Sequence, residues 1–187
     1  MPLPRFDRLA PEARAAILAV AREHFARDGR DGASFNRIIA DAGISKTSAY
    51  HYFDGKEDLF GAVAGDVAAR TVAVLGAWPE AATADELWKR LTEGSARLRA
   101  HLRNHPGDRA VLAAADRPAG AEDPWITAMV ANGVRIGLID PAPGIAFVTA
   151  ATAAVIGVAD GLALDRPGDD VTPALRLLLE RLWNAGR

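Results

Sequence analysis

The most suggestive chemistry in this chain is a short run of hydrogen-bond donors that contains no acid. Between Ser45 and Phe53 the sequence reads SKTSAYHYF, with hydroxyl, ammonium and imidazole groups but no Asp or Glu. Phosphate oxygens are negatively charged acceptors, so a surface of this kind suits a nucleic-acid backbone. The residues expected to face outward are Lys46, Thr47, Ser48, Tyr50 and His51.

A second candidate is a pair of histidines four residues apart, His101 and His105, which could share one helix face and bind a metal. A zinc site needs three or four ligands, and no Cys or Glu completes this set. Histidines near a helix end also complement the helix dipole, and we favour that interpretation. The sequence has no cysteine, no Ser-His-Asp ordering and no phosphate-binding glycine motif, so we expect neither an enzyme nor a cofactor.

Composition indicates an ordinary soluble protein, because half of the 187 residues are apolar and a quarter are charged. Residues 1–56 carry nine Lys and Arg against seven Asp and Glu, whereas the rest carries thirteen against seventeen. The longest apolar stretch, 144–159, is shorter than the roughly 20 residues that cross a bilayer, and we interpret it as a buried helix. We expect a cytoplasmic protein without a membrane partner.

The elements that must position the donor run are helices throughout. Ala, Leu, Arg and Glu are abundant, and no sustained alternation of apolar and polar residues indicates a strand. Glycines, prolines and capping residues divide the chain into about nine helices. The expected ranges are 11–29, 34–42, 45–53, 56–75, 84–104, 107–115, 123–138, 144–164 and 172–183.

The second and third expected helices form a helix-turn-helix. Ser34 and Ser45 can cap their starts, and Gly43 can adopt the left-handed backbone that ends the first of them. The helix after the turn is short enough to lie in a DNA major groove. We therefore divide the all-α chain into a three-helix DNA-binding domain, 1–55, and a larger helical ligand-binding and dimerisation domain, 56–187.

The stretch AGISKTSAYHYFDGKEDLF, with the helix before it, resembles the signature of TetR-family transcriptional regulators over about residues 11–65. Two positions depart from the family pattern: Ala49, where Leu or Ile is frequent, and Tyr52, where His is frequent. The resemblance implies that DNA is contacted by Ser34, Asn36, Ser45, Lys46, Thr47, Tyr50, His51 and Lys56. Within this set Asn36 could equally serve only to start a helix, and we expect Tyr52 and Phe53 to be core residues.

The larger domain offers a candidate pocket for a small apolar effector. The expected apolar walls are Trp88, Trp125 and Met129, and Thr92, Ser95 and Asn132 could supply polar groups. The alternative is an ordinary packed core.

The last two helices carry more apolar residues than one face can hold, which predicts a two-fold dimer interface. Its expected members are Ile156, Gly157, Gly161, Leu175, Leu178, Leu179 and Leu182. The alternative is that this face closes the domain internally.

Together these features favour a homodimeric, ligand-responsive repressor that a small apolar effector releases from a near-palindromic double-stranded DNA operator. An activator or a ligand-independent regulator would have the same sequence features. A third alternative, an adaptor that has lost DNA binding, is disfavoured because no acid interrupts the donor run.

Overall fold

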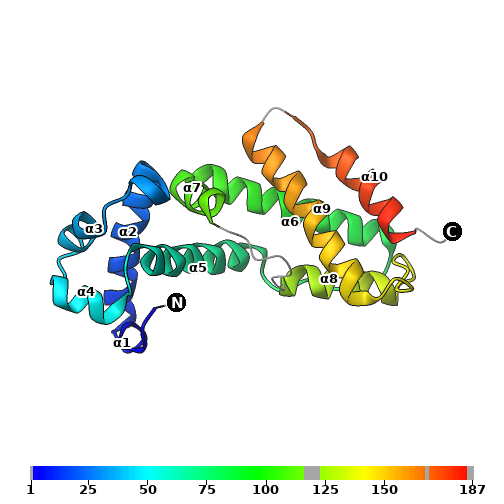
Figure 1. The fold of residues 1–187 in the computed structure, drawn as a ribbon. Coiled ribbons are helices and arrows are strands. Elements are labelled where there is room, and N and C mark those ends of the chain that lie inside the picture. The colour runs from blue at the N-terminus through cyan, green and yellow to red at the C-terminus, as the bar shows by residue number, and fades with distance from the viewer. Residues whose placement is uncertain (1, 116–122, 167–168, 185–187) are drawn as a thin grey trace. The chain divides into compact units, whose positions relative to one another are not determined.

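The computed structural model describes residues 2–115, 123–166 and 169–184, and every regular element in these ranges is an α-helix (Figure 1). The all-helical prediction is confirmed. The helices are α1 (Pro4–Asp7), α2 (Pro11–Gly32), α3 (Phe35–Asp41), α4 (Lys46–Tyr52), α5 (Lys56–Leu75), α6 (Ala84–Asn104), α7 (Pro106–Ala114), α8 (Pro124–Arg135), α9 (Ile145–Asp165) and α10 (Thr172–Trp183).

The one helix that the sequence analysis missed is α1, which is only four residues long. A single turn is too short to show helical periodicity. Its Phe6 is buried, and the ring centroid lies 4.7 Å from that of Phe53. The backbone N–H of Leu3 donates to the carbonyl of Tyr52 at 2.9 Å. These contacts attach the start of the chain to the end of α4.

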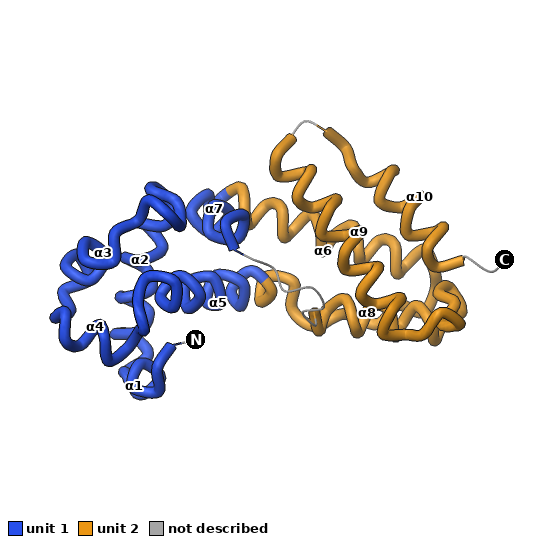
Figure 2. The backbone as a smooth tube through the Cα atoms, in the orientation of Figure 1, with its two compact units in different colours: residues 1–71, 104–116 blue, residues 72–103, 117–187 orange. Residues whose placement is uncertain are grey.

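The chain forms two compact units, each with its own apolar core (Figure 2). Residues 1–71 and 104–116 make the N-terminal unit, and residues 72–103 and 117–187 make the C-terminal unit. The N-terminal unit is larger than the helix-turn-helix alone, because it also holds α7 and most of α5. Val111 of α7 is fully buried in this core beside residues of α2 and α5.

Helix α2 supplies one wall of the N-terminal core with the stripe Ile17, Ala21 and Phe25, all buried. The Phe25 ring packs edge-on against Phe60 of α5, with centroids 5.0 Å apart. Gly29, expected to end this helix, has φ +73° and interrupts it, after which helical backbone resumes as far as Gly32. Glycine suits this position because a left-handed backbone carries no steric cost without a Cβ atom.

The core of the C-terminal unit is built by the inner faces of α6, α8, α9 and α10. Leu87, Leu91, Met129 and Leu179 are all essentially inaccessible to solvent. The indole of Trp183 is also fully buried, and its Nε1–H donates to Thr152 Oγ1 at 3.0 Å. This hydrogen bond satisfies the polar atom of an otherwise apolar side chain.

The expectation that the apolar stretch of α9 is a buried helix is wrong. Only one stripe of this 21-residue helix is buried, at positions 148, 152, 156, 159 and 163. Phe147 and Val158 on the outer side are 65% and 64% exposed. Among the described helices, α9 also has the length and apolar composition of a membrane span. The helix is apolar all round, but the elements that cover it within this chain pack on one side.

Candidate nucleic-acid interface

The turn between α3 and α4 is built as the sequence predicts. The Ser34 side chain accepts from the N–H of Arg37, and Ser45 Oγ accepts from the N–H of Ser48 at 3.0 Å. Gly43 has φ +68° and ends α3. Capping oxygens satisfy N–H groups that have no partner inside the helix. The two short helices are thus held in a helix-turn-helix by local chemistry.

Helix α4 buries one side and exposes its donors on the other. Ala49 is fully buried, so its small side chain allows α4 to pack closely on the core. Phe53, which follows the helix, is also fully buried, which confirms its predicted core role. The exposed side of α4 carries Lys46, Thr47, Tyr50 and His51. Ser48 is half-buried, and its hydroxyl accepts from that of Ser45 at 2.9 Å.

Tyr50 presents an aromatic surface as well as a hydroxyl. Its side chain is 52% exposed, and its ring lies 5.5 Å from the half-buried ring of Phe35 on α3. This ring contact packs α4 against α3. The other predicted contacts on α3, Ser34 and Asn36, are exposed as well.

Two basic residues beside these donors, Lys56 and Arg37, differ in their exposure to solvent. Lys56 is half-buried, and its Nζ donates to the backbone carbonyl of Asp31 at 2.7 Å. An ammonium group has three donors, so two remain for other partners. Arg37 is exposed in the first turn of α3, and the sequence analysis did not include it. In the sequence, Arg37 could have been identified as a DNA-contact candidate because it follows Asn36 at the start of a helix.

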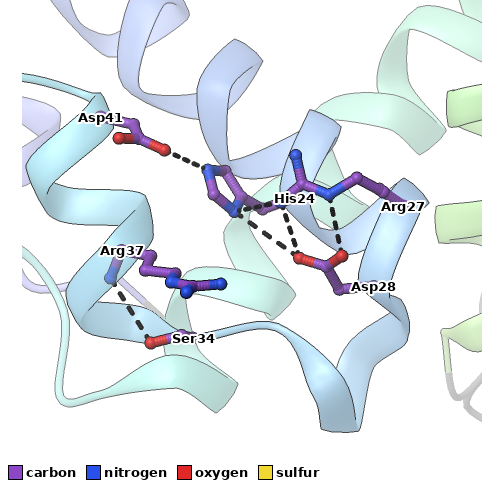
Figure 3. A network of polar contacts seen from close by, with 6 residues as sticks. All are labelled: His24, Arg27, Asp28, Ser34, Arg37 and Asp41. Carbon is purple, nitrogen blue, oxygen red and sulfur yellow. Dashed lines mark hydrogen bonds and ion pairs between the residues drawn. The ribbon is translucent and has the colours of Figure 1, made fainter.

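A buried histidine joins α2 to the end of α3 (Figure 3). His24 is 5% exposed, and its Nε2 lies 2.8 Å from Asp41 Oδ2. Arg27 Nη2 lies 3.0 Å from His24 Nδ1. Because a guanidinium only donates, Nδ1 is the acceptor and Nε2–H donates to Asp41. Since Asp41 is the last residue of α3, this contact positions the helix-turn-helix on α2.

The same network extends to Asp28, which accepts from Arg27 at 2.8 and 2.7 Å. These hydrogen bonds with Arg27 hold the pKa of Asp28 below its usual value, and they raise the pKa of Arg27. His24 could not be identified from the sequence, because its partner Asp41 lies 17 residues away. The available signal was its place beside Phe25, on the apolar stripe of α2.

A buried acid forms a second polar junction of the N-terminal unit. Asp108 of α7 is 1% exposed. Its Oδ1 lies 3.2 Å from a terminal nitrogen of Arg22 on α2 and 3.4 Å from one of Arg70 on α5. Two guanidinium groups compensate for the burial of one carboxylate. The cluster joins three helices of this unit around a single charge.

The residues predicted to line a ligand pocket separate into two groups. Trp88, Thr92 and Ser95 line a hollow between α6 and α10. Trp125 and Met129 do not, because both are buried in the core of the C-terminal unit.

Asn132, considered as a polar group of the pocket, is also a core residue. Its side-chain oxygen accepts from Trp78 Nε1 at 2.8 Å and from the N–H of Ala81 at 2.7 Å. Its amide nitrogen donates to the carbonyl of Ala81 at 2.9 Å. These three bonds give the 1% exposed side chain a structural role.

The predicted interface residues also divide by exposure. Ile156, Leu175 and Leu179 are buried within this chain's own core. Gly157 and Leu182 are half-buried, whereas Gly161 and Leu178 are exposed. The exposed apolar surface of α9 and α10, which we call the outer face, consists of Phe147, Val158, Gly161, Leu162, Leu177 and Leu178.

His101 and His105 were considered as a possible metal-binding pair because of their spacing in the sequence. Across the described ranges, no group of three or more His, Cys, Asp or Glu side chains could hold a metal ion.

Comparison with known proteins supports the interpretation of the N-terminal region. Residues 17–63 match the family described as bacterial regulatory proteins, tetR family. A 62-residue stretch is 40% identical to the HTH-type transcriptional repressor AcnR of Corynebacterium diphtheriae. That match spans 33% of this chain and 33% of the relative.

Solved structures resemble the fold over nearly the whole chain. A putative tetR family transcription regulator from Shewanella sp. PV-4 aligns with a TM-score of 0.64 at 17% identity, covering 92% of this chain and 97% of that one. A putative transcriptional regulator from Streptomyces coelicolor aligns with a TM-score of 0.52 at 26% identity, covering 92% and 98%. The sequence likeness is thus concentrated in the helix-turn-helix, and the structural likeness extends through both units.

Proposed function

We propose that this chain is a transcriptional repressor of the TetR type that binds DNA through α3 and α4, because residues 17–63 match the tetR family and the fold resembles that of a putative tetR family regulator. Members of this family are DNA-binding transcription factors and not enzymes. The observation that carries the proposal is the exposed, acid-free donor face of α4 with Lys46, Thr47, Tyr50 and His51. Such a face can meet both phosphates and base edges in a major groove. Binding to chromosomal DNA implies a cytoplasmic protein.

The side chains suggest a division of roles on the DNA. Lys46 and Thr47 begin α4, and the first turn of a recognition helix approaches both base edges and the phosphates beside them. Tyr50 and His51 lie further along the helix, where their donors suit phosphate oxygens. Ser34 and Asn36 at the start of α3 would contact the backbone beside them.

We also propose a homodimer, because one helix-turn-helix contacts too few base pairs for useful specificity. The outer face of α9 and α10 supports this step. Leu177 and Leu178 are 49% and 53% exposed, and Val158 and Leu162 of α9 are 64% and 45% exposed. A large apolar patch on a soluble protein marks an interaction site. A two-fold pairing through this face would place two recognition helices on one near-palindromic operator.

An effector would act by preferring a conformation that DNA does not. If a ligand binds the C-terminal unit of the dimer and favours a different separation of the two α4 helices, operator affinity falls. The two half-sites must lie about 34–36 Å apart, one helical turn, for both helices to enter the groove. Release by a small molecule therefore requires only a modest change in this spacing.

The experiment that tests the proposal is selection of genomic fragments by the purified protein, followed by footprinting. We expect one or a few strongly protected sites with two-fold symmetry. Genes beside these sites should be transcribed more strongly when the protein is deleted. Protection of a single asymmetric half-site, or no protection at low salt, would contradict the proposal.

A further inference from the structure

The hollow between α6 and α10 has a volume of about 70 Å³ and lies wholly within the C-terminal unit. Its residues on α6 recur at helical spacing, so one stripe of that helix faces the hollow. The stripe carries Trp88, Leu91, Ser95 and Arg99, and α10 supplies Leu175 and Arg176.

The apolar part of this lining is well packed. Leu91 and Leu175 are buried, and the Trp88 ring packs on the ring of Trp183 with centroids 4.9 Å apart. Trp183 itself is fully buried. An aliphatic group that enters the hollow would therefore meet a preformed apolar surface, which is the usual character of a small-molecule site.

The polar part of the lining consists of two arginines and three hydroxyl groups, and none of the lining residues is acidic. The guanidinium carbon of Arg176 lies 5.1 Å from the centroid of the Trp88 ring. Glu180 accepts from Nε of Arg176 at 2.8 Å, and Asp160 lies 3.5 Å from a terminal nitrogen of Arg99. These acids hold the two guanidinium groups in place from outside the lining. Each arginine has five N–H donors, so most remain for a ligand.

Ser95 adds a hydroxyl to the α6 side of the hollow. The residue is 5% exposed and lies one helical turn before Arg99 on the same stripe. The neighbouring Thr92 donates its hydroxyl to the carbonyl of Trp88 at 2.8 Å. A hydroxyl can donate as well as accept, so the Ser95 hydroxyl can donate to a ligand oxygen beside the donors of Arg99.

We propose that this hollow binds a short-chain aliphatic carboxylate, an inference that rests on the proposed function and names the chemical class of its effector. Arginine donors suit a carboxylate, which they can bind through two parallel hydrogen bonds. The small volume favours a ligand with a small body, because the hollow has about half the volume of a roughly 150 Å³ cavity that holds a benzene ring. A chain of a few carbons fits the surface formed by Trp88, Leu91 and Leu175. The effector is thus amphipathic and anionic, rather than simply apolar.

The first test uses the full-length wild-type protein without DNA and three matched probes. Butyrate, butyramide and butylamine share a short aliphatic chain but carry a negative, a neutral and a positive head group. Calorimetric titration should show binding of butyrate, at least about tenfold weaker binding of butyramide, and none of butylamine, because hydrogen bonds to a charged group are the stronger ones. Equal binding of butyrate and butyramide, or no heat from butyrate at millimolar concentration, would overturn the proposal.

The second test assigns binding to this hollow. Arg176→Gln removes one lining charge and Ser95→Ala removes one lining hydroxyl, and each should weaken butyrate binding by about tenfold. Lys89→Gln is the matched control, since this exposed residue of α6 is not part of the lining. Butyrate should also quench the fluorescence of Trp88, and the concentration needed should rank the wild type and the variants in the same order as their affinities for butyrate. Unchanged affinity in both lining variants would place any binding elsewhere and contradict the assignment.

The carboxylate site and the DNA-binding face are tested by separate experiments. The titrations contain no DNA, so a negative result overturns the carboxylate site and leaves the DNA-binding proposal intact. If the protein protects no genomic site, butyrate binding can still be measured on the same preparation.

Discussion

The contact between His24 and Asp41 predicts how firmly the helix-turn-helix is held on α2. His24→Ala removes a buried imidazole and the 2.8 Å hydrogen bond to the last residue of α3. A hydrogen bond to a charged group contributes about 1.5–3 kcal/mol, and the 63% exposure of the Asp41 side chain favours the lower end. Loss of the packed ring adds to this. We therefore expect the local opening of α3 to become easier by about 2–3 kcal/mol.

Hydrogen exchange measures this free energy locally, peptide by peptide. A loss of about 2–3 kcal/mol corresponds to roughly 30- to 150-fold faster exchange of the α3 amides. Peptides from α8, in the other unit, should exchange at the wild-type rate. Glu23→Ala is the control, because Glu23 is the exposed neighbour of His24 on the same helix. In a double-mutant cycle with Asp41→Ala, the coupling should be about 1 kcal/mol. If exchange in α3 rises less than about threefold, the contact does not hold the helix and the reasoning is wrong.

Three further predictions concern packing, pH and assembly. Gly94→Ala should lower the free energy of unfolding by about 1–3 kcal/mol, because its new Cβ would lie 2.7 Å from the ring of Trp125. The control Gly61→Ala should not destabilise the protein, because there is open space around Gly61. The backbone hydrogen bond from Ala82 lowers the pKa of Glu86. The ionised Glu86 side chain therefore stabilises the fold above the usual Glu pKa, and this stabilisation is lost as the pH falls through the lowered pKa of Glu86. Glu86→Gln should therefore flatten the acid side of the stability profile in denaturant titrations, and an unchanged profile would contradict this. Leu178→Glu should reduce the sedimenting mass from twice 19.7 kDa toward 19.7 kDa, whereas a dimer that persists would exclude the outer face as the interface.

Features governed by nearby residues could be predicted from the sequence. Ser34 and Ser45 cap their helices and Gly43 takes a positive φ because each responds to groups within three or four residues. Features that depend on distant partners could not be predicted in the same way. His24 looks like one more position on an apolar stripe until the fold brings Asp41 against it.

The C-terminal unit shows the same contrast. Leucines at 175, 177, 178 and 179 surround α10, so periodicity alone does not say which side faces the core. The structure buries Leu175 and Leu179 and exposes the other two. The donors of the hollow were also missed, because Arg99 and Arg176 come from helices 77 residues apart in the chain. Only Trp88, Thr92 and Ser95 could be predicted as lining residues, because they lie on one amphipathic helix.

The central claim, that the exposed face of α4 binds DNA, is tested most directly by the salt dependence of operator binding. Wild type, Lys46→Ala and the control Lys89→Ala are titrated against one operator fragment at several salt concentrations. The logarithm of the binding constant falls with the logarithm of salt by about 0.9 per neutralised phosphate. If Lys46 contacts one phosphate in each subunit of a dimer, Lys46→Ala should weaken binding and reduce the slope by about two, and Lys89→Ala should change neither. Equal affinity and equal slope for wild type and Lys46→Ala would contradict the claim.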